Sequence, residues 1–378
     1  MKKIFALLLV FAMVFALCAC GSGSSSAKTE DPAKDDPLYL NSLTLEEIEQ
    51  KAKDGGRLDT IGMPSDWCNW GKFFDKYTEM YGIAHTDTDM SSSEQIALFE
   101  AEKDDPTKDM GEIGQQNISK IMSKGVAQAY KPSCWDKIPD WAKDEDGYWC
   151  IPYVGVISTM TNLDVVGKEI TSFKDMADDL DNGTINYKVT IGDPTNESSS
   201  QHIVLAAAYA FGGDVNNLQP GIDFFRRLAE AGALDAGNNE TQRYAKGEST
   251  VLMQWDYKNI QALENLPADM HVSIHVMKDG AIASGYLSGL INRWAPHPEA
   301  AALARELIFS EWGQLNFAAA GATPTRTDIV VPEGTCSYDI PDEEYANIIP
   351  VVNFQDDWIK SSADLARMWE EEVVPYMN

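Results

Sequence analysis

Two serine-rich segments carry residues that could bind a small anion. One is the run from Ser91 to Ser93, and the other combines Asn196 with Ser198 and Ser199. Each segment lies where a predicted strand ends and a helix begins, so free backbone N–H groups and hydroxyls would point at the same place. Capping a helix needs only one serine, so both helix capping and anion binding remain possible roles for these segments.

Two acid–tryptophan pairs could instead bind an ammonium group. Asp66 precedes Trp67, and Trp255 precedes Asp256, each in a predicted loop after a strand. A carboxylate beside an indole suits a cation, although either tryptophan could equally be core or a wall of the cleft. Tyr153, at the start of a long predicted strand, completes the candidate ligand-binding residues. Together they favour an anionic or zwitterionic solute such as a phosphonate or phosphate ester, with a polyamine as the alternative.

An enzyme is the alternative to a binding protein, but the sequence contains no recognised catalytic motif. It contains no G-x-S-x-G, H-E-x-x-H, Walker or C-x-x-C pattern. His271 and His275 share one face of a predicted strand but lie roughly 13 Å apart at about 3.3 Å per residue, too far to hold one metal. We therefore expect no catalytic residue, no metal and no cofactor.

The N-terminus has the pattern of an export signal. Lys2 and Lys3 precede an apolar run over 4–17, which as a helix would span only about 21 Å against roughly 30 Å of hydrocarbon. Leu-Cys-Ala-Cys at its end resembles the bacterial lipobox, which implies cleavage after residue 19 and lipid on Cys20. Residues 1–19 are thus predicted to be a signal peptide. The alternative is an ordinary secretory signal with incidental cysteines.

The composition limits the partners. The net charge of −29 includes the two lysines and no acid of the leader, so the mature chain carries −31. Such a surface cannot neutralise a phosphate backbone, which excludes nucleic acid, and the membrane is expected to hold the protein only through the acyl anchor. With 44% apolar residues, the chain can bury two ordinary cores, so two domains are expected.

Four further cysteines lack metal-binding spacing: Cys68, Cys134, Cys150 and Cys336. Because an exported chain can form disulfides, Cys134 and Cys150 are the pair that we consider first.

Strands and helices alternate along the chain. Residues 20–54 are predicted to hold the anchor, a linker and a short helix capped by Thr44. Further strands are predicted at 57–63, 83–86, 108–114, 187–192, 249–254 and 272–276, and helices at 71–81, 95–103, 172–180, 221–231, 298–309, 314–320 and 361–372. This alternation is typical of βαβ units on a mainly parallel sheet. The long extended runs 150–163 and 281–292 are predicted to cross between two lobes.

Several fragments, in this order, resemble the extracellular solute-binding proteins of ABC importers, in the cluster with ferric-ion, polyamine and phosphonate or sugar-phosphate binders. They are 62–67 (GMPSDW), 87–93 (DTDMSSS), 138–144 (IPDWAKD), 192–194 (GDP), 255–257 (WDY), 295–301 (APHPEAA) and 320–324 (AGATP). The resemblance implies an α/β, two-lobed, type II periplasmic-binding-protein-like fold with two crossing hinge strands and a ligand cleft between the lobes. Lobe 1 is expected at 55–157 plus about 285–325, and lobe 2 at 158–284 plus about 326–378.

The same resemblance implies a transport function. A lipid-anchored monomer on the extracytoplasmic side of the cell membrane would capture a small-molecule solute and deliver it to the permease of an ABC importer by closing the cleft. Ferric-ion members typically present adjacent tyrosines, and this chain has no Tyr-Tyr pair. Iron is therefore disfavoured, and a secreted hydrolase is the remaining alternative.

Overall fold

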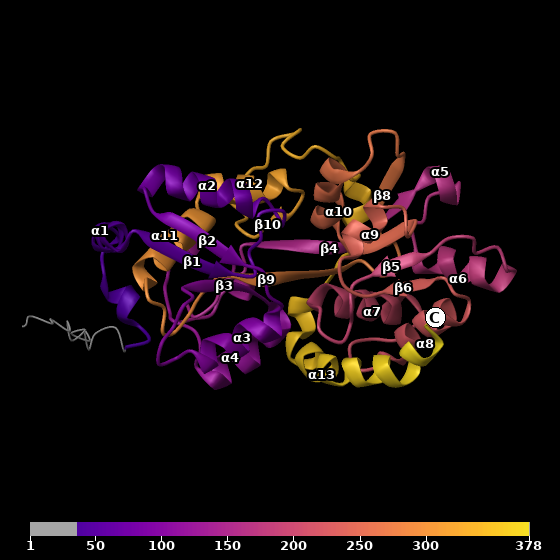
Figure 1. Ribbon diagram of the computed structural model, residues 1–378, viewed down its shortest axis with the longest axis horizontal. Coiled ribbons are helices and arrows are strands. Elements are labelled where there is room, and N and C mark those ends of the chain that lie inside the picture. The colour runs from indigo at the N-terminus through magenta and orange to yellow at the C-terminus, as the bar shows by residue number, and fades with distance from the viewer. Residues whose placement is uncertain (1–35, 378) are drawn as a thin grey trace, which may run out of the picture.

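A computed structural model describes residues 36–377, which form two α/β lobes on one mixed sheet of eleven strands (Figure 1). The main strand order is β2-β1-β3-β9-β4-β7-β5-β6, with β10 (Thr323–Pro324), β8 and β11 (Ile349–Pro350) paired to its central strands. The predicted signal peptide and Cys20 lie outside the described residues. Among those described, no helix is long and apolar enough to cross a membrane.

Lobe 1 is built on three parallel strands: β1 (Arg57–Ile61), β2 (Ala84–Thr88) and β3 (Met110–Gly114). Its helices are α1 (Leu45–Gly55), α2 (Trp70–Tyr81), α3 (Ser92–Ala101), α4 (Ile118–Lys124), α11 (Pro298–Ile308) and α12 (Glu311–Ala319). The apolar faces of β1 and α2 bury Leu58, Ile61, Phe73 and Tyr77 completely. This burial fixes the carboxyl end of β1 and the loop that follows it.

Lobe 2 repeats the pattern with β5 (Val189–Ile191), β6 (Leu234–Ala236), β7 (Val251–Trp255) and β8 (Val272–Val276). Its helices are α5 (Leu163–Val166), α6 (Phe173–Asn182), α7 (Ser198–Ala210), α8 (Gln219–Glu230), α9 (Glu240–Ala245), α10 (Asp256–Ala262) and α13 (Gln355–Glu372). The apolar helix α7 is buried through most of its length, and α13 lies along the outside of this lobe (Figure 1). The ring of Trp369 on α13 packs 5.5 Å from that of Phe225 on α8.

Two long strands join the lobes, as the sequence predicted. They are β4 (Tyr153–Asn162) and β9 (Ile282–Ile291), which pair antiparallel with each other from Val154–Gly285 to Val156–Ala283. Strand β4 then continues into lobe 2 against β7 and β8, while β9 continues into lobe 1 against β3. The sheet is therefore mixed, because β4 runs antiparallel to β7 and β8, and β9 runs antiparallel to β3.

Helix starts follow the capping residues of the sequence. Thr44 and Glu47 form a capping box at α1, Ser91 and Glu94 form one at α3, and the Ser172 hydroxyl caps α6. Helix α3 begins at Ser92, three residues before the predicted start, because the first serine of the run is the N-cap. Helix α13 is longer than predicted and begins at Gln355.

The four cysteines of the described chain are free thiols. Cys134 and Cys150, the pair that we considered first, form no disulfide. Burial raises the pKa of the Cys150 thiol to about 11, so little reactive thiolate is present at neutral pH.

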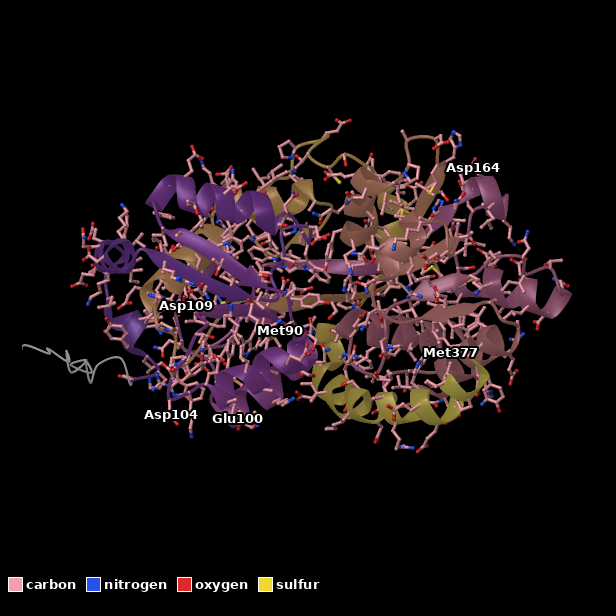
Figure 2. All side chains as sticks on the ribbon, viewed as in Figure 1. Met90, Glu100, Asp104, Asp109, Asp164 and Met377 are labelled. Atoms are coloured by element: carbon pink, nitrogen blue, oxygen red, sulfur yellow. The ribbon has the colours of Figure 1, made fainter. Side chains whose placement is uncertain are left out.

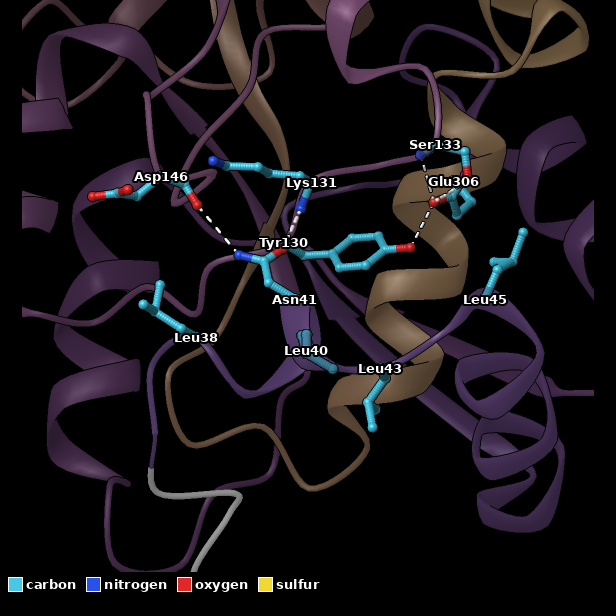
Figure 3. Close-up of a pocket in the computed structure, with 10 residues that line it drawn as sticks. All are labelled: Leu38, Leu40, Asn41, Leu43, Leu45, Tyr130, Lys131, Ser133, Asp146 and Glu306. Atoms are coloured by element: carbon cyan, nitrogen blue, oxygen red, sulfur yellow. Dashed lines mark hydrogen bonds between the residues drawn. The ribbon is translucent and has the colours of Figure 1, made fainter.

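A small pocket of about 430 Å³ lies at the end of lobe 1 beside the N-terminal segment (Figure 3). Leu38, Leu40 and Leu43 form its apolar side. On the other side, Glu306 accepts hydrogen bonds from the Ser133 backbone, at 2.8 Å, and from the Tyr130 hydroxyl, at 2.5 Å. These bonds tie the loop after residue 130 to helix α11.

Candidate functional site

A cleft of about 990 Å³ lies between the two lobes. Lobe 1 contributes the loop after β1 and the start of α3, lobe 2 contributes the starts of α7 and α9 with one side of α10, and hinge strand β9 contributes Tyr286. Figure 2 places Met90, which lines this cleft, where the two halves of the molecule meet. The carboxyl ends of parallel strands and the helix starts that follow them are where α/β proteins bind ligands.

Eight of the eleven predicted ligand-binding residues line this cleft: Asp66, Trp67, Ser91, Ser92, Ser93, Asn196, Ser198 and Ser199. They come from both lobes, and the fold brings them to one cleft. The other three, Tyr153, Trp255 and Asp256, are not in its lining.

Those three residues are completely buried. Trp255 ends β7 with its side chain in the core, where its indole N–H donates to the Tyr286 hydroxyl at 3.2 Å. The Asp256 carboxylate accepts from the backbone N–H of Val156 and from the Tyr345 hydroxyl, both at 3.1 Å. The second acid–tryptophan pair is thus buried in lobe 2, where it bonds to both hinge strands and does not line the cleft.

Most of the cleft serines already have protein partners. Ser91 donates its backbone N–H and its hydroxyl to Glu94, at 2.9 and 2.7 Å, and the Ser92 hydroxyl accepts from the Gly114 backbone at 3.0 Å. The Ser198 hydroxyl donates across the cleft to the side chain of Gln116 at 2.9 Å. In lobe 1, Ser91 therefore caps α3 and Ser92 joins the start of α3 to the end of β3.

Carboxylates dominate the lining. Among the described residues around the cleft there are six acids, Asp66, Asp89, Glu94, Glu112, Glu197 and Glu240, and one basic residue, Lys258. Neither Asp66 nor Asp89 has a hydrogen-bond or ion-pair partner in the described part of the chain. Desolvation and the negative charges of Asp87 and Asp66 raise the pKa of Asp89.

Two further acids in the cleft hold protons more tightly than usual. Burial raises the pKa of Glu112 to about 7, although Ser288, Tyr153 and Trp70 all donate hydrogen bonds to it. Burial and the nearby charge of Glu240 raise the pKa of Glu197 to about 7. Both shifts have the same main origin, because burial disfavours the charged form of a carboxyl group.

The Trp67 ring is held rigidly in the lobe 1 wall. Its indole N–H donates to the Tyr153 hydroxyl at 3.3 Å, and the rings of Tyr257 and Tyr286 approach it edge-on at 5.8 and 5.5 Å. The ammonium of Lys258 lies 4.5 Å from the ring centroid, in a cation–π contact. This wall already binds a cation from its own chain.

Sequence reasoning missed Asp89, Glu112, Glu197, Glu240, Lys258 and Tyr286. Asp89 lies inside the DTDMSSS fragment and Glu197 lies between the predicted Asn196 and Ser198, so both were within reach. Glu240, Lys258 and Tyr286 reach the cleft only through the packing of α9, α10 and β9.

One group elsewhere in the described chain has metal-ligating chemistry. Oxygens of Asp59 and Asp109 and a ring nitrogen of His297 lie within 4.8 Å of one another. These acids already accept hydrogen bonds, Asp59 from Arg57 at 2.9 Å and Asp109 from the His297 backbone at 2.6 Å. The group therefore acts as a polar network that joins β1 to the start of α11.

The fold can be compared with known proteins. The periplasmic binding protein AfuA from Actinobacillus pleuropneumoniae, with fructose-6-phosphate bound, has a TM-score of 0.64 at 18% identity, over 84% of this chain and 98% of its own. Iron-bound HitA from Pseudomonas aeruginosa has a TM-score of 0.64 at 14% identity, over 82% of this chain and 98% of its own. The spermidine/putrescine ABC transporter substrate-binding protein PotD from Streptococcus pneumoniae has a TM-score of 0.57 at 13% identity, over 84% of this chain and 99% of its own. These likenesses confirm the predicted two-lobed type II fold.

The sequence itself carries a family signal, although no curated protein matches it. A family model described as bacterial extracellular solute-binding protein matches residues 105–348, which is more than half of the 378 residues. The match covers the crossing strands and most of lobe 2, and it confirms the resemblance drawn from the short fragments. The chain therefore belongs to the family of bacterial extracellular solute-binding proteins.

Proposed function

We propose that this protein captures a small cationic solute with ammonium groups, such as a polyamine, and delivers it to the permease of an ABC importer. The observation that carries this proposal is the lining of the cleft, where six carboxylates stand against one lysine. The order of the sequence-based hypotheses is thereby reversed, since these put an anionic or zwitterionic solute first.

The placement of the acids suits a solute that is charged at both ends. Asp66 and Asp89 lie on the lobe 1 side beside Trp67, whereas Glu197 and Glu240 lie on the lobe 2 side. An ammonium group taken out of water needs an opposite charge and hydrogen-bond acceptors, and these acids supply both. The face of the Trp67 indole adds a contact that suits a cation.

The same charges disfavour a phosphate ester or a phosphonate. A doubly charged anion would approach several carboxylates in a partly desolvated space, where repulsion is weakly screened. The hydroxyls of Ser91, Ser92 and Ser198 are already bonded to protein groups. A phosphate would therefore compete with Glu94 and Gln116 for the hydrogen-bonding groups of Ser91 and Ser198.

A zwitterionic solute is the second candidate, and the start of α7 favours it. The Ser199 hydroxyl has no partner in the described part of the chain, and the first backbone N–H groups of any helix lack an intrahelical acceptor. An anionic end could bind there while the ammonium end faces Asp66 and Trp67. An amino-acid-like solute would use both features.

The remaining parts of the proposal concern the whole chain. We infer that residues 1–19 are removed and that Cys20 carries the lipid that holds a monomer on the outer side of the cell membrane. We further infer that lobe 1 comprises 55–157 with about 285–325, and lobe 2 comprises 158–284 with about 326–378. Packing of α13 against α8 supports the second assignment.

Native mass spectrometry of the purified protein, followed by calorimetry, tests the ligand class. Spermidine and putrescine are expected to bind one-to-one and to be recovered chemically unchanged, whereas fructose-6-phosphate and 2-aminoethylphosphonate are expected to bind far more weakly. Tight binding of the sugar phosphate without binding of spermidine would restore the anionic hypothesis. Turnover of a phosphate ester in proportion to protein would instead indicate a hydrolase.

A further inference from the structure

We infer that Lys258 is a tethered cation which holds the two lobes together by occupying the face of Trp67, the place that an ammonium group of the solute would take. The solute would displace Lys258 from the ring. This displacement rests on the proposed function, whereas the contact that Lys258 makes between the lobes does not.

The contact joins the two lobes directly. Trp67 lies in the loop after β1 of lobe 1, and Lys258 lies on α10 of lobe 2. The lysine ammonium is 4.5 Å from the centroid of the indole. Tyr257 and Tyr286 make T-shaped contacts with the indole, and the ammonium of Lys258 lies over the ring, where the face attracts a cation.

A buried partner holds the lysine in place from its own lobe. The Lys258 ammonium lies 3.0 Å from a carboxylate oxygen of Glu240 on α9, and the two side chains are only 18% and 9% exposed. Glu240 would keep its counter-charge if Lys258 swung away from Trp67 by rotation about its flexible stem. Displacement by a solute therefore need not leave a buried charge unpaired.

Competition between two cations follows from this geometry. An incoming ammonium group and Lys258 cannot share one indole face, and each is attracted by the same acids of the cleft. The lysine would therefore lower the apparent affinity for any solute that needs this face, as an internal competitor does. It would also discriminate against neutral solutes, which cannot replace its charge.

Small-angle X-ray scattering of the solute-free protein tests the contact between the lobes. Lys258→Met is expected to enlarge the radius of gyration, and Lys258→Arg, which keeps a cation over the ring, is expected to match the parent. The matched control is Lys143→Met, because Lys143 lies 4.9 Å over the Trp135 ring within lobe 1 and is 12% exposed. An unchanged radius for Lys258→Met would overturn the proposal.

Lys258→Met leaves the Glu240 carboxylate without its partner and could unfold the protein. Two variants avoid this: Lys258→Met with Glu240→Gln removes both charges, and Trp67→Leu removes the ring but keeps the ion pair. Both are expected to open the solute-free protein as Lys258→Met does. If neither changes the scattering while circular dichroism shows a folded protein, the lysine does not hold the lobes together.

Calorimetry with spermidine separates this inference from the proposed function. Affinity of the Lys258→Met, Glu240→Gln variant is expected to rise relative to Glu240→Gln alone, by roughly three- to tenfold for one cation–π contact removed from competition. A fall in affinity would overturn the displacement step. If the parent binds no amine at all, the proposed function fails, and scattering alone decides whether Lys258 joins the lobes.

Discussion

The carboxylate of Asp256 accepts a hydrogen bond from the backbone N–H of Val156 at 3.1 Å, which fixes helix α10 of lobe 2 to hinge strand β4. Glu112 of lobe 1 does the same at the other end, accepting from the hydroxyls of Tyr153 on β4 and Ser288 on β9. One buried acid from each lobe is therefore bonded to the strands that cross between the lobes.

Asp256→Asn tests how the buried carboxyl group of Asp256 affects the stability of the folded protein. Burial raises the pKa of Asp256 from 3.8 to about 7, so between these values the folded state binds more protons than the unfolded state and loses stability as pH rises. The asparagine can keep the acceptor for Val156 and can donate to the Tyr345 hydroxyl. Its stability relative to the parent is expected to rise with pH by about 1 kcal/mol per unit in this range.

Urea unfolding of both proteins at several pH values measures that difference. Asp140→Asn is the control, because the Asp140 side chain is fully exposed, and its stability relative to the parent should not vary with pH over the same range. A flat difference for Asp256→Asn would mean that the carboxylate is not kept protonated by burial.

Asp66→Asn with Asp89→Asn tests the ammonium site. Both acids line the cleft without a protein partner, so losing them should weaken spermidine binding by about 2–4 kcal/mol, as expected when a partly desolvated cation loses its counter-charges. Calorimetric titration measures this loss, and Asp104→Asn, on the outer end of lobe 1 (Figure 2), is the control.

Ser199→Ala tests the alternative end of the cleft. The variant should bind spermidine nearly as the parent does. A zwitterionic solute bound at the start of α7 should lose about 1–3 kcal/mol of binding free energy, because its hydrogen bond to Ser199 is removed. Titrating this variant with spermidine and with an amino acid distinguishes the two candidates. Strong loss of spermidine binding in Ser199→Ala would show that the ammonium site has been placed on the wrong wall.

Gly155→Ala tests the tightness of the hinge. A methyl group added to Gly155 would lie 2.5 Å from a ring carbon of Tyr257, so either β4 or α10 must shift. We expect destabilisation of about 1–3 kcal/mol by overpacking, measured by thermal or urea unfolding. Gly55→Ala, which meets only an atom 3.4 Å away at the end of α1, is the control and should not destabilise comparably.

Cys20→Ser tests the predicted lipid anchor. The variant should fold normally but be released from washed membranes, because two or more acyl chains at about 0.8 kcal/mol per buried methylene are needed for stable attachment. Cys18→Ser should stay membrane-bound. Fractionation followed by immunoblotting checks both, and a membrane-bound Cys20→Ser protein would contradict the lipoprotein assignment.

Local patterns allowed much of the fold to be predicted from the sequence. The Thr44 cap placed the start of α1, and the serine run predicted a helix at α3 although its start was set three residues too late, since a capping box involves only residues three apart. The long extended runs at 150–163 and 281–292 identified β4 and β9 as crossing strands, because each is long enough to be shared by two lobes. Such signals depend on neighbours along the chain.

The composition of the cleft was decided by the tertiary structure. Lys258 and Glu240 are separated by 18 residues and carry no motif, yet α9 and α10 place them 3.0 Å apart against Trp67 of the other lobe. Conversely, Trp255 and Asp256 have the same residue types as the first acid–tryptophan pair but turn into the core. Sequence alone therefore determined the two-lobed architecture. The direction of each side chain, and with it the net charge of the cleft, depended on packing between distant elements.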